Sequence, residues 1–171
     1  MKETIKDMSR FSVANYVTNL FWIIPSTVLP LLVIGLLGAE QNAYFFIAWR
    51  IATLISVAAA SISLSLFAEG SHSEDRLAQE VRGSLKFTLL FLIPAITLIF
   101  LLGDKVLLLF GREYSENATK LLWILAVSAL PLSINHIYFG AKRVEKKMRS
   151  VIGLNAFIAV LTLGLSYILL P

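Results

Sequence analysis

The sequence contains no cysteine, which excludes a disulfide framework and a thiolate metal site. Charged residues are also scarce, at 15% of 171 residues, whereas hydrophobic residues make up 57% and the mean hydropathy is +0.78. The basic residues lie in short loops rather than in one patch, so we expect no nucleic-acid partner. Nucleophile elbows, phosphate loops and metal-binding motifs are missing as well. The sequence therefore predicts neither an enzyme nor a bound cofactor.

Long apolar segments make up most of the chain. A helix of about 20 residues crosses the hydrocarbon core of a bilayer, and five segments approach or exceed that length. They are continuous apolar runs without the alternation that marks a transmembrane β-strand. We therefore predict an all-α fold, a polytopic transmembrane helical bundle that forms one domain over residues 1–171. The predicted spans are residues 11–37, 43–67, 85–102, 121–138 and 151–170.

The distribution of Lys and Arg between the loops predicts the orientation. With the N-terminus in the cytoplasm, eleven Lys and Arg residues fall in cytoplasmic segments and three fall in outer loops. Cytoplasmic loops of membrane proteins carry an excess of basic residues. We therefore expect a multi-pass protein of the cytoplasmic membrane with a cytoplasmic N-terminus.

Arg50 is the basic residue that lies well inside a predicted span. It stands about seven residues from the outer end of the second span, which corresponds to a depth of about 10 Å. A guanidinium group that faces an internal cavity binds phosphate or carboxylate oxygens in pairs. The alternative is that the side chain extends outward to the lipid headgroups. The sequence leaves both interpretations open.

A polar stripe follows the first span, and a smaller polar face follows the fourth. Side chains spaced three or four residues apart share one face of a helix, and polar ones do not face lipid. Such a face either lines a water-filled pathway or bonds a neighbouring helix. On the fourth span Asn135 shares a face with Ser128 and Pro131. The stripe of the first span contains Asn15, Thr18, Asn19, Trp22 and Ser26.

Several motifs, in their order and spacing, are similar to those of a known transporter family. They are the outer turn and helix start at 38–49, residues 63–71, the run Leu109–Tyr114, Ala118, and residues 121–125. From about Met8 to its end, the chain resembles the polysaccharide-lipid flippases of the MATE-like (MOP) exporter superfamily. These are polysaccharide biosynthesis membrane proteins.

The resemblance implies a transporter with two helical lobes around a central cavity, of which this chain corresponds to a partial second lobe. The implied function is export of a lipid-linked polysaccharide precursor by alternating access. The implied partners are the lipid bilayer, the lipid-linked glycan, and either the missing N-terminal lobe or a second copy of the chain. Arg50 is the residue that we expect to bind the diphosphate, and Asn15, Asn19 and Asn135 are expected to bind the sugar.

Two other functions remain open at the sequence level. A MATE-type drug or metabolite antiporter has the same fold, but it requires acidic or other ion-coupling residues inside its spans, and the predicted spans contain none. A membrane scaffold subunit without transport activity is the other alternative. In that case the polar faces serve only to pack helices.

Overall fold

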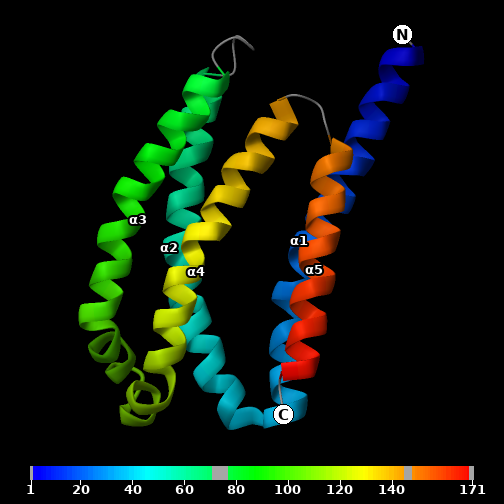
Figure 1. The fold of residues 1–171 in the computed structure, drawn as a ribbon. Coiled ribbons are helices and arrows are strands. Elements are labelled where there is room, and N and C mark those ends of the chain that lie inside the picture. Colours follow the sequence, from blue (N-terminus) through cyan, green and yellow to red (C-terminus); the bar gives the residue numbers. More distant parts are fainter. Residues whose placement is uncertain (1, 71–76, 145–147, 170–171) are drawn as a thin grey trace. The chain divides into compact units, whose positions relative to one another are not determined.

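The computed structural model describes the backbone of residues 2–70, 77–144 and 148–169. It describes the side chains of residues 12–57, 60, 61, 78–142 and 149–168. The described backbone is helical apart from short turns at 38 and 109–111, which confirms the all-α prediction. The helices are α1 (Lys2–Leu37), α2 (Ala39–Gly70), α3 (Leu77–Leu108), α4 (Arg112–Val144) and α5 (Met148–Leu169) (Figure 1).

The helices extend further than the apolar segments from which they were predicted. The expected outer loop at 103–120 contains only a turn at 109–111, because α3 continues to Leu108 and α4 begins at Arg112. The expected loop at 38–42 is likewise helical from Ala39 onward. The helices extend into these segments because hydropathy marks the edge of the hydrocarbon, whereas a helix continues as long as its backbone bonds are made.

A glycine with positive φ ends each of the first and third helices. Gly38 has a φ of 90°, and its amide donates to the carbonyl of Ile34 at an N···O distance of 3.2 Å. Gly111 has a φ of 130°, and its amide donates to the carbonyl of Leu108 at 3.0 Å. Glycine is favoured at such positions because it has no Cβ to clash in the left-handed region. Gly38 therefore ends α1, and Gly111 fixes the turn at which the chain reverses direction between α3 and α4.

Within the described residues, four helices are long and apolar enough to cross a membrane. The parts of these helices that are able to span a membrane are Ser12–Leu37, Ala78–Leu108, Arg112–Lys142 and Arg149–Ile168. These parts contain the first, third and fourth predicted spans almost completely, and most of the fifth. The inner half of the second predicted span, 43–67, lies mostly outside the described side chains. That span therefore stays a prediction.

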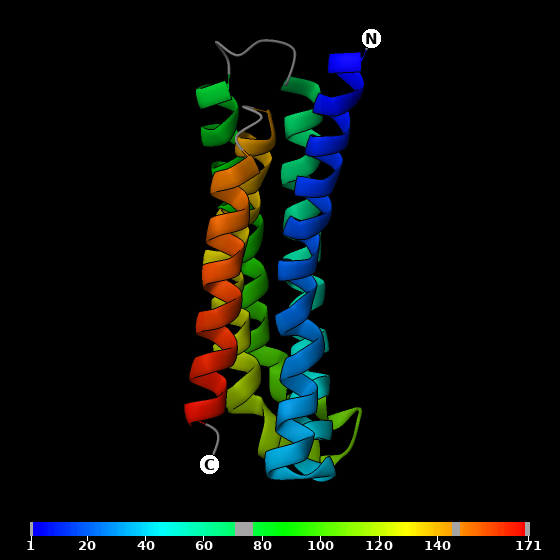
Figure 2. The ribbon, with the colours of Figure 1, turned by 90° about the vertical axis from the view of Figure 1, so that its right-hand side faces the viewer.

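The chain forms two compact units, and the first of them pairs α1 with α5. Both views show α5 alongside α1, with the two helices running in the same direction (Figures 1 and 2). Val33 of α1 and Val151 and Ala159 of α5 are buried, and Asn155 of α5 donates to the Thr18 carbonyl of α1. Lipid tails are as apolar as these side chains, so the hydrophobic effect does not hold the two helices together in a bilayer. Close packing stabilises the pair instead.

The second unit contains α2, α3 and α4. Helices α2 and α4 run in the same direction and α3 runs opposite to them (Figure 1). Small side chains recur every fourth residue where α2 and α4 meet the core. Small residues allow helix backbones to approach closely, which is how transmembrane helices pack. The core cluster contains Tyr44, Ala48, Ala52, Ile99, Leu107, Ala118, Leu122 and Ala126.

Candidate functional site

Arg50 lies on an exposed, otherwise apolar face of α2. Leu54 and Val57 continue this face, and Leu54 is 71% exposed. The Arg50 guanidinium carbon lies 4.7 Å from the centre of the Phe46 ring, which is a cation–π contact. Phe46 is one helical turn nearer the start of α2 than Arg50. The Arg50 side chain therefore points toward the start of α2.

The α1 stripe divides between helix packing and exposed surface. Thr18 is buried, and its Oγ1 donates to the carbonyl of Ala14 at 2.8 Å. Asn155 of α5 donates from Nδ2 to the Thr18 carbonyl at 3.4 Å, which joins the two helices. Asn15 is half-buried and Asn19 is exposed. Thr18 thus serves helix packing, while Asn19 remains accessible within the unit formed by α1 and α5.

Asn135 lies on α4 in the other unit and is half-buried. Helices α2 and α4 run in the same direction, and Ile55 packs beside Ala129. By this register Asn135 is level with about residue 61 of α2, roughly 16 Å along the bundle from Arg50. The second unit therefore does not bring Arg50 and Asn135 into one pocket. The two residues lie at different levels along the second unit.

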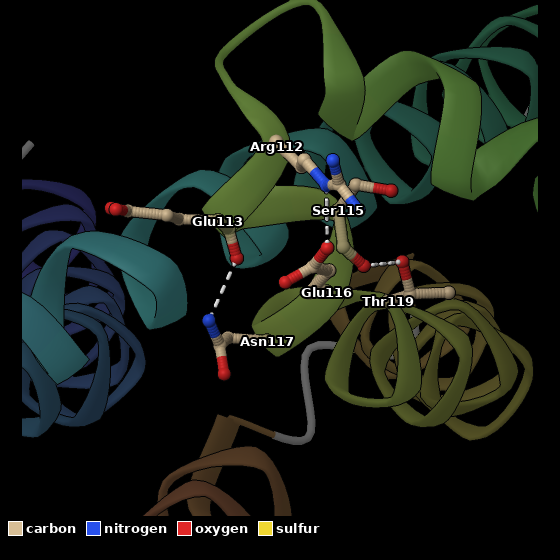
Figure 3. Close-up of polar contacts among 6 residues, drawn as sticks. All are labelled: Arg112, Glu113, Ser115, Glu116, Asn117 and Thr119. Atoms are coloured by element: carbon tan, nitrogen blue, oxygen red, sulfur yellow. Dashed lines mark hydrogen bonds and ion pairs between the residues drawn. The ribbon is translucent and has the colours of Figure 1, made fainter.

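Several polar contacts at the start of α4 join residues of that helix to one another (Figure 3). Arg112 donates from Nε to Oε1 of Glu116 at 2.8 Å, and both side chains are exposed. Asn117 donates to the carbonyl of Glu113 at 2.9 Å, and Thr119 donates to the carbonyl of Ser115 at 2.6 Å. These bonds stabilise the first turns of α4.

Aromatic residues connect this end of α4 with α2. The rings of Tyr44 and Tyr114 meet edge to face with centroids 5.1 Å apart. The Tyr44 hydroxyl donates to Oε2 of Glu113 at 3.4 Å, so the buried ring keeps a partner for its polar end. Phe110 approaches Tyr114 with a centroid distance of 6.4 Å. Tyr and Trp are common where a helix leaves the hydrocarbon, and this cluster marks that level.

Buried polar groups that the sequence analysis missed lie on α3 and α5. Oε2 of Glu80, Oγ of Ser84 and Oδ1 of Asn155 are buried without a hydrogen-bond partner. Glu80 lies outside the predicted span 85–102, but in the structure it is in the first turn of α3, inside the long apolar part Ala78–Leu108. The four-residue spacing of Glu80 and Ser84 was the available signal.

The arrangement of long apolar helices, with polar groups on helix faces, is that of a multi-pass α-helical membrane protein. Residues 16–168 match the sequence model of the MatE family, and the chain belongs to that family. MatE proteins are membrane transporters and not enzymes. No curated protein and no solved structure gives a significant match to the chain. The family match confirms the transport part of the expectation made from the sequence motifs.

Proposed function

We propose that this MATE-type protein exports a lipid-linked polysaccharide precursor across the cytoplasmic membrane. The chain acts as one lobe, together with a first lobe of the same transporter or with a second copy. The N-terminus lies in the cytoplasm, as the distribution of basic residues favours. Alternating exposure of the substrate path to the two membrane faces moves the glycan, while the lipid tails stay in the bilayer.

Arg50 and its surroundings carry this proposal. A lipid-linked glycan joins a phosphate group to a long apolar chain, and the α2 face offers a cation beside apolar side chains. The Phe46 ring restrains the guanidinium at 4.7 Å, which lowers the entropy lost when it binds phosphate oxygens. Leu54 and Val57, both exposed on the same face, provide an apolar surface for the start of the lipid chain.

The three asparagines supply hydrogen bonds to the sugar in this proposal. An asparagine amide has both donor and acceptor groups, which suits it to sugar hydroxyls. Asn19 is exposed and Asn15 is one turn away on α1, so both amides serve one sugar unit. Asn135 lies at another depth on α4 and meets the glycan at another stage of its passage.

Substitution of Arg50 tests this function. In cells that depend on the protein for glycan export, Arg50→Ala is expected to lower export by at least tenfold at an unchanged protein level. Arg50→Lys is expected to retain partial export, because lysine keeps the charge but loses the paired oxygen contact. Arg112→Ala is the matched control, since Arg112 is an exposed arginine in a helical ion pair. Equal export by Arg50→Ala and Arg112→Ala at equal protein level contradicts the proposal.

A MATE-type drug or metabolite antiporter is the second candidate function. The buried carboxylate oxygen of Glu80 favours it, because an antiporter needs a group that binds the coupling ion. The two functions differ in what they predict for cells that lack the protein. Loss of a drug exporter raises sensitivity to lipophilic cations without changing the surface glycan. Loss of the proposed exporter changes the surface glycan.

A further inference from the structure

Positive charge is concentrated in one short segment, residues 142–149, which joins the end of α4 to the start of α5 and is called the basic segment below. Five of its eight residues are basic and one, Glu145, is acidic, so its net charge is +4. The whole chain also has a net charge of +4, which means that the charges outside this segment cancel one another. The five basic residues are Lys142, Arg143, Lys146, Lys147 and Arg149.

Membrane orientation alone does not account for this concentration of charge. The rule that orients membrane proteins counts Lys and Arg in cytoplasmic loops and gives acidic residues little weight. Residues 68–86 lie on the same side of the membrane in the predicted orientation, and they include three basic and four acidic residues. Both segments satisfy the rule, yet residues 68–86 have a net charge of −1 and the basic segment has +4. A surface of one sign attracts a partner of the opposite sign.

Helix geometry places both ends of the basic segment at the level of the lipid headgroups. The apolar run of α4 ends at about Tyr138, and that of α5 begins at about Val151. At 1.5 Å per residue, Lys142 of α4 lies about 6 Å beyond the first run, and Arg149 of α5 lies about 3 Å beyond the second. The headgroup region of a bilayer is about 5–8 Å thick on each side. Both residues therefore lie where lipid phosphates are found.

The start of α5 combines an exposed cation with an exposed apolar face. Arg149 is exposed, and the first turn of α5 contains no acidic residue that would neutralise it. Val160 lies eleven residues further along, which is three helical turns, so it shares the face of Arg149. Val160 is 71% exposed. A phosphate next to the basic segment would thus have its acyl chains beside an apolar helix face, as the shape of a phospholipid requires.

We propose that the basic segment binds anionic phospholipids of the membrane that surrounds the protein. Clusters of four to eight Lys and Arg residues directly beside a transmembrane helix attract anionic headgroups. The charges are spread over eight residues at the membrane surface, which suits several headgroups better than one enclosed ligand. In the predicted orientation these lipids belong to the cytoplasmic leaflet. The proposal does not depend on the identity of the transported substrate, and its test involves no transport.

Lipid retention by the full-length protein tests the proposal. The protein is placed in nanodiscs with equal amounts of phosphatidylglycerol and phosphatidylcholine in both leaflets, so the result does not depend on orientation. It is then released in a mass spectrometer, and the lipids that stay bound are counted. Wild-type protein is expected to retain about fivefold more phosphatidylglycerol than phosphatidylcholine. The double variant Lys146→Gln, Lys147→Gln is expected to lower this ratio at least about twofold, and Arg149→Gln is expected to lower it less.

A matched control separates the basic segment from a general effect of charge. The double variant Arg82→Gln, Lys86→Gln also removes two positive charges, and both side chains are exposed on α3. It is expected to keep the wild-type lipid ratio. A wild type that retains both lipids equally overturns the proposal, and so does an equal loss in the control. A ratio that survives in Lys146→Gln, Lys147→Gln and in Arg149→Gln overturns it as well. Retention of an added lipid-linked diphosphate without any preference for phosphatidylglycerol would instead assign the segment to that substrate.

Discussion

Gly103 and Leu122 give a quantitative test of how α3 packs on α4. A Cβ added at Gly103 would lie 3.2 Å from Cδ2 of Leu122, closer than most contacts between carbon atoms. Leu122 is 0% exposed, so it has little freedom to withdraw. Gly103→Ala gains about 1 kcal/mol from helix propensity, and the crowding removes about 1–3 kcal/mol. We expect the unfolding free energy to be unchanged or to fall by up to about 2 kcal/mol.

Leu122→Ala is expected to cost about 2–5 kcal/mol, because a buried cavity replaces the leucine side chain. The same change removes the atom that crowds the methyl group introduced by Gly103→Ala, so the double variant recovers the propensity gain without the clash. We predict a coupling of about 1–2 kcal/mol in favour of the double variant, measured by unfolding in mixed micelles. Gly153→Ala combined with Leu122→Ala is the control pair, since a Cβ at Gly153 meets no atom within 4 Å. Additivity of Gly103→Ala and Leu122→Ala within about 0.5 kcal/mol would refute this account of the packing.

Two further substitutions test single contacts. Asn155→Leu is expected to leave Tm unchanged or to raise it, because it removes a buried oxygen without a partner and a long 3.4 Å bond; a large fall in Tm would show that the α1–α5 contact depends on the amide. Gly111→Ala is expected to lower the unfolding free energy by about 1–3 kcal/mol, because an L-residue is strained at a φ of 130°. If Gly111→Ala melts at the wild-type temperature, the turn between α3 and α4 adopts another conformation.

The helices and most of the spans were predictable because continuous apolar runs of this length have one solution in a bilayer. The helix ends were not predictable, since Arg112, Glu113 and Glu116 continue α4 outside the apolar run. These charged residues are compatible with a helix in water and form bonds within it, as Arg112 and Glu116 do. Composition therefore predicts which segments are apolar enough for the hydrocarbon, whereas the backbone hydrogen bonds of the structure show where each helix ends.

Some properties of the candidate residues were predictable from the sequence and others were not. The direction of the Arg50 side chain follows from helix geometry, because side chains on a helix tilt toward its N-terminus, which is the outer end of α2 in the predicted orientation. The burial of Asn155 depends on α1 packing beside α5, and no spacing within α5 reveals it. Glu80 was missed because its segment is polar, although its carboxylate is covered in the folded unit. Whether such polar side chains are buried depends on the helices packed beside them, which the sequence alone does not reveal.

Transport by purified protein is the most direct test of the central claim. The full-length protein is reconstituted in liposomes whose inner leaflet contains a lipid-linked glycan labelled with a fluorophore, and an impermeant reductant is added outside. The account predicts that wild-type protein exposes the inner-leaflet label to the reductant, and that Arg50→Ala does so at least tenfold more slowly. Loss of fluorescence no faster than in protein-free liposomes would contradict the proposed export of a lipid-linked glycan.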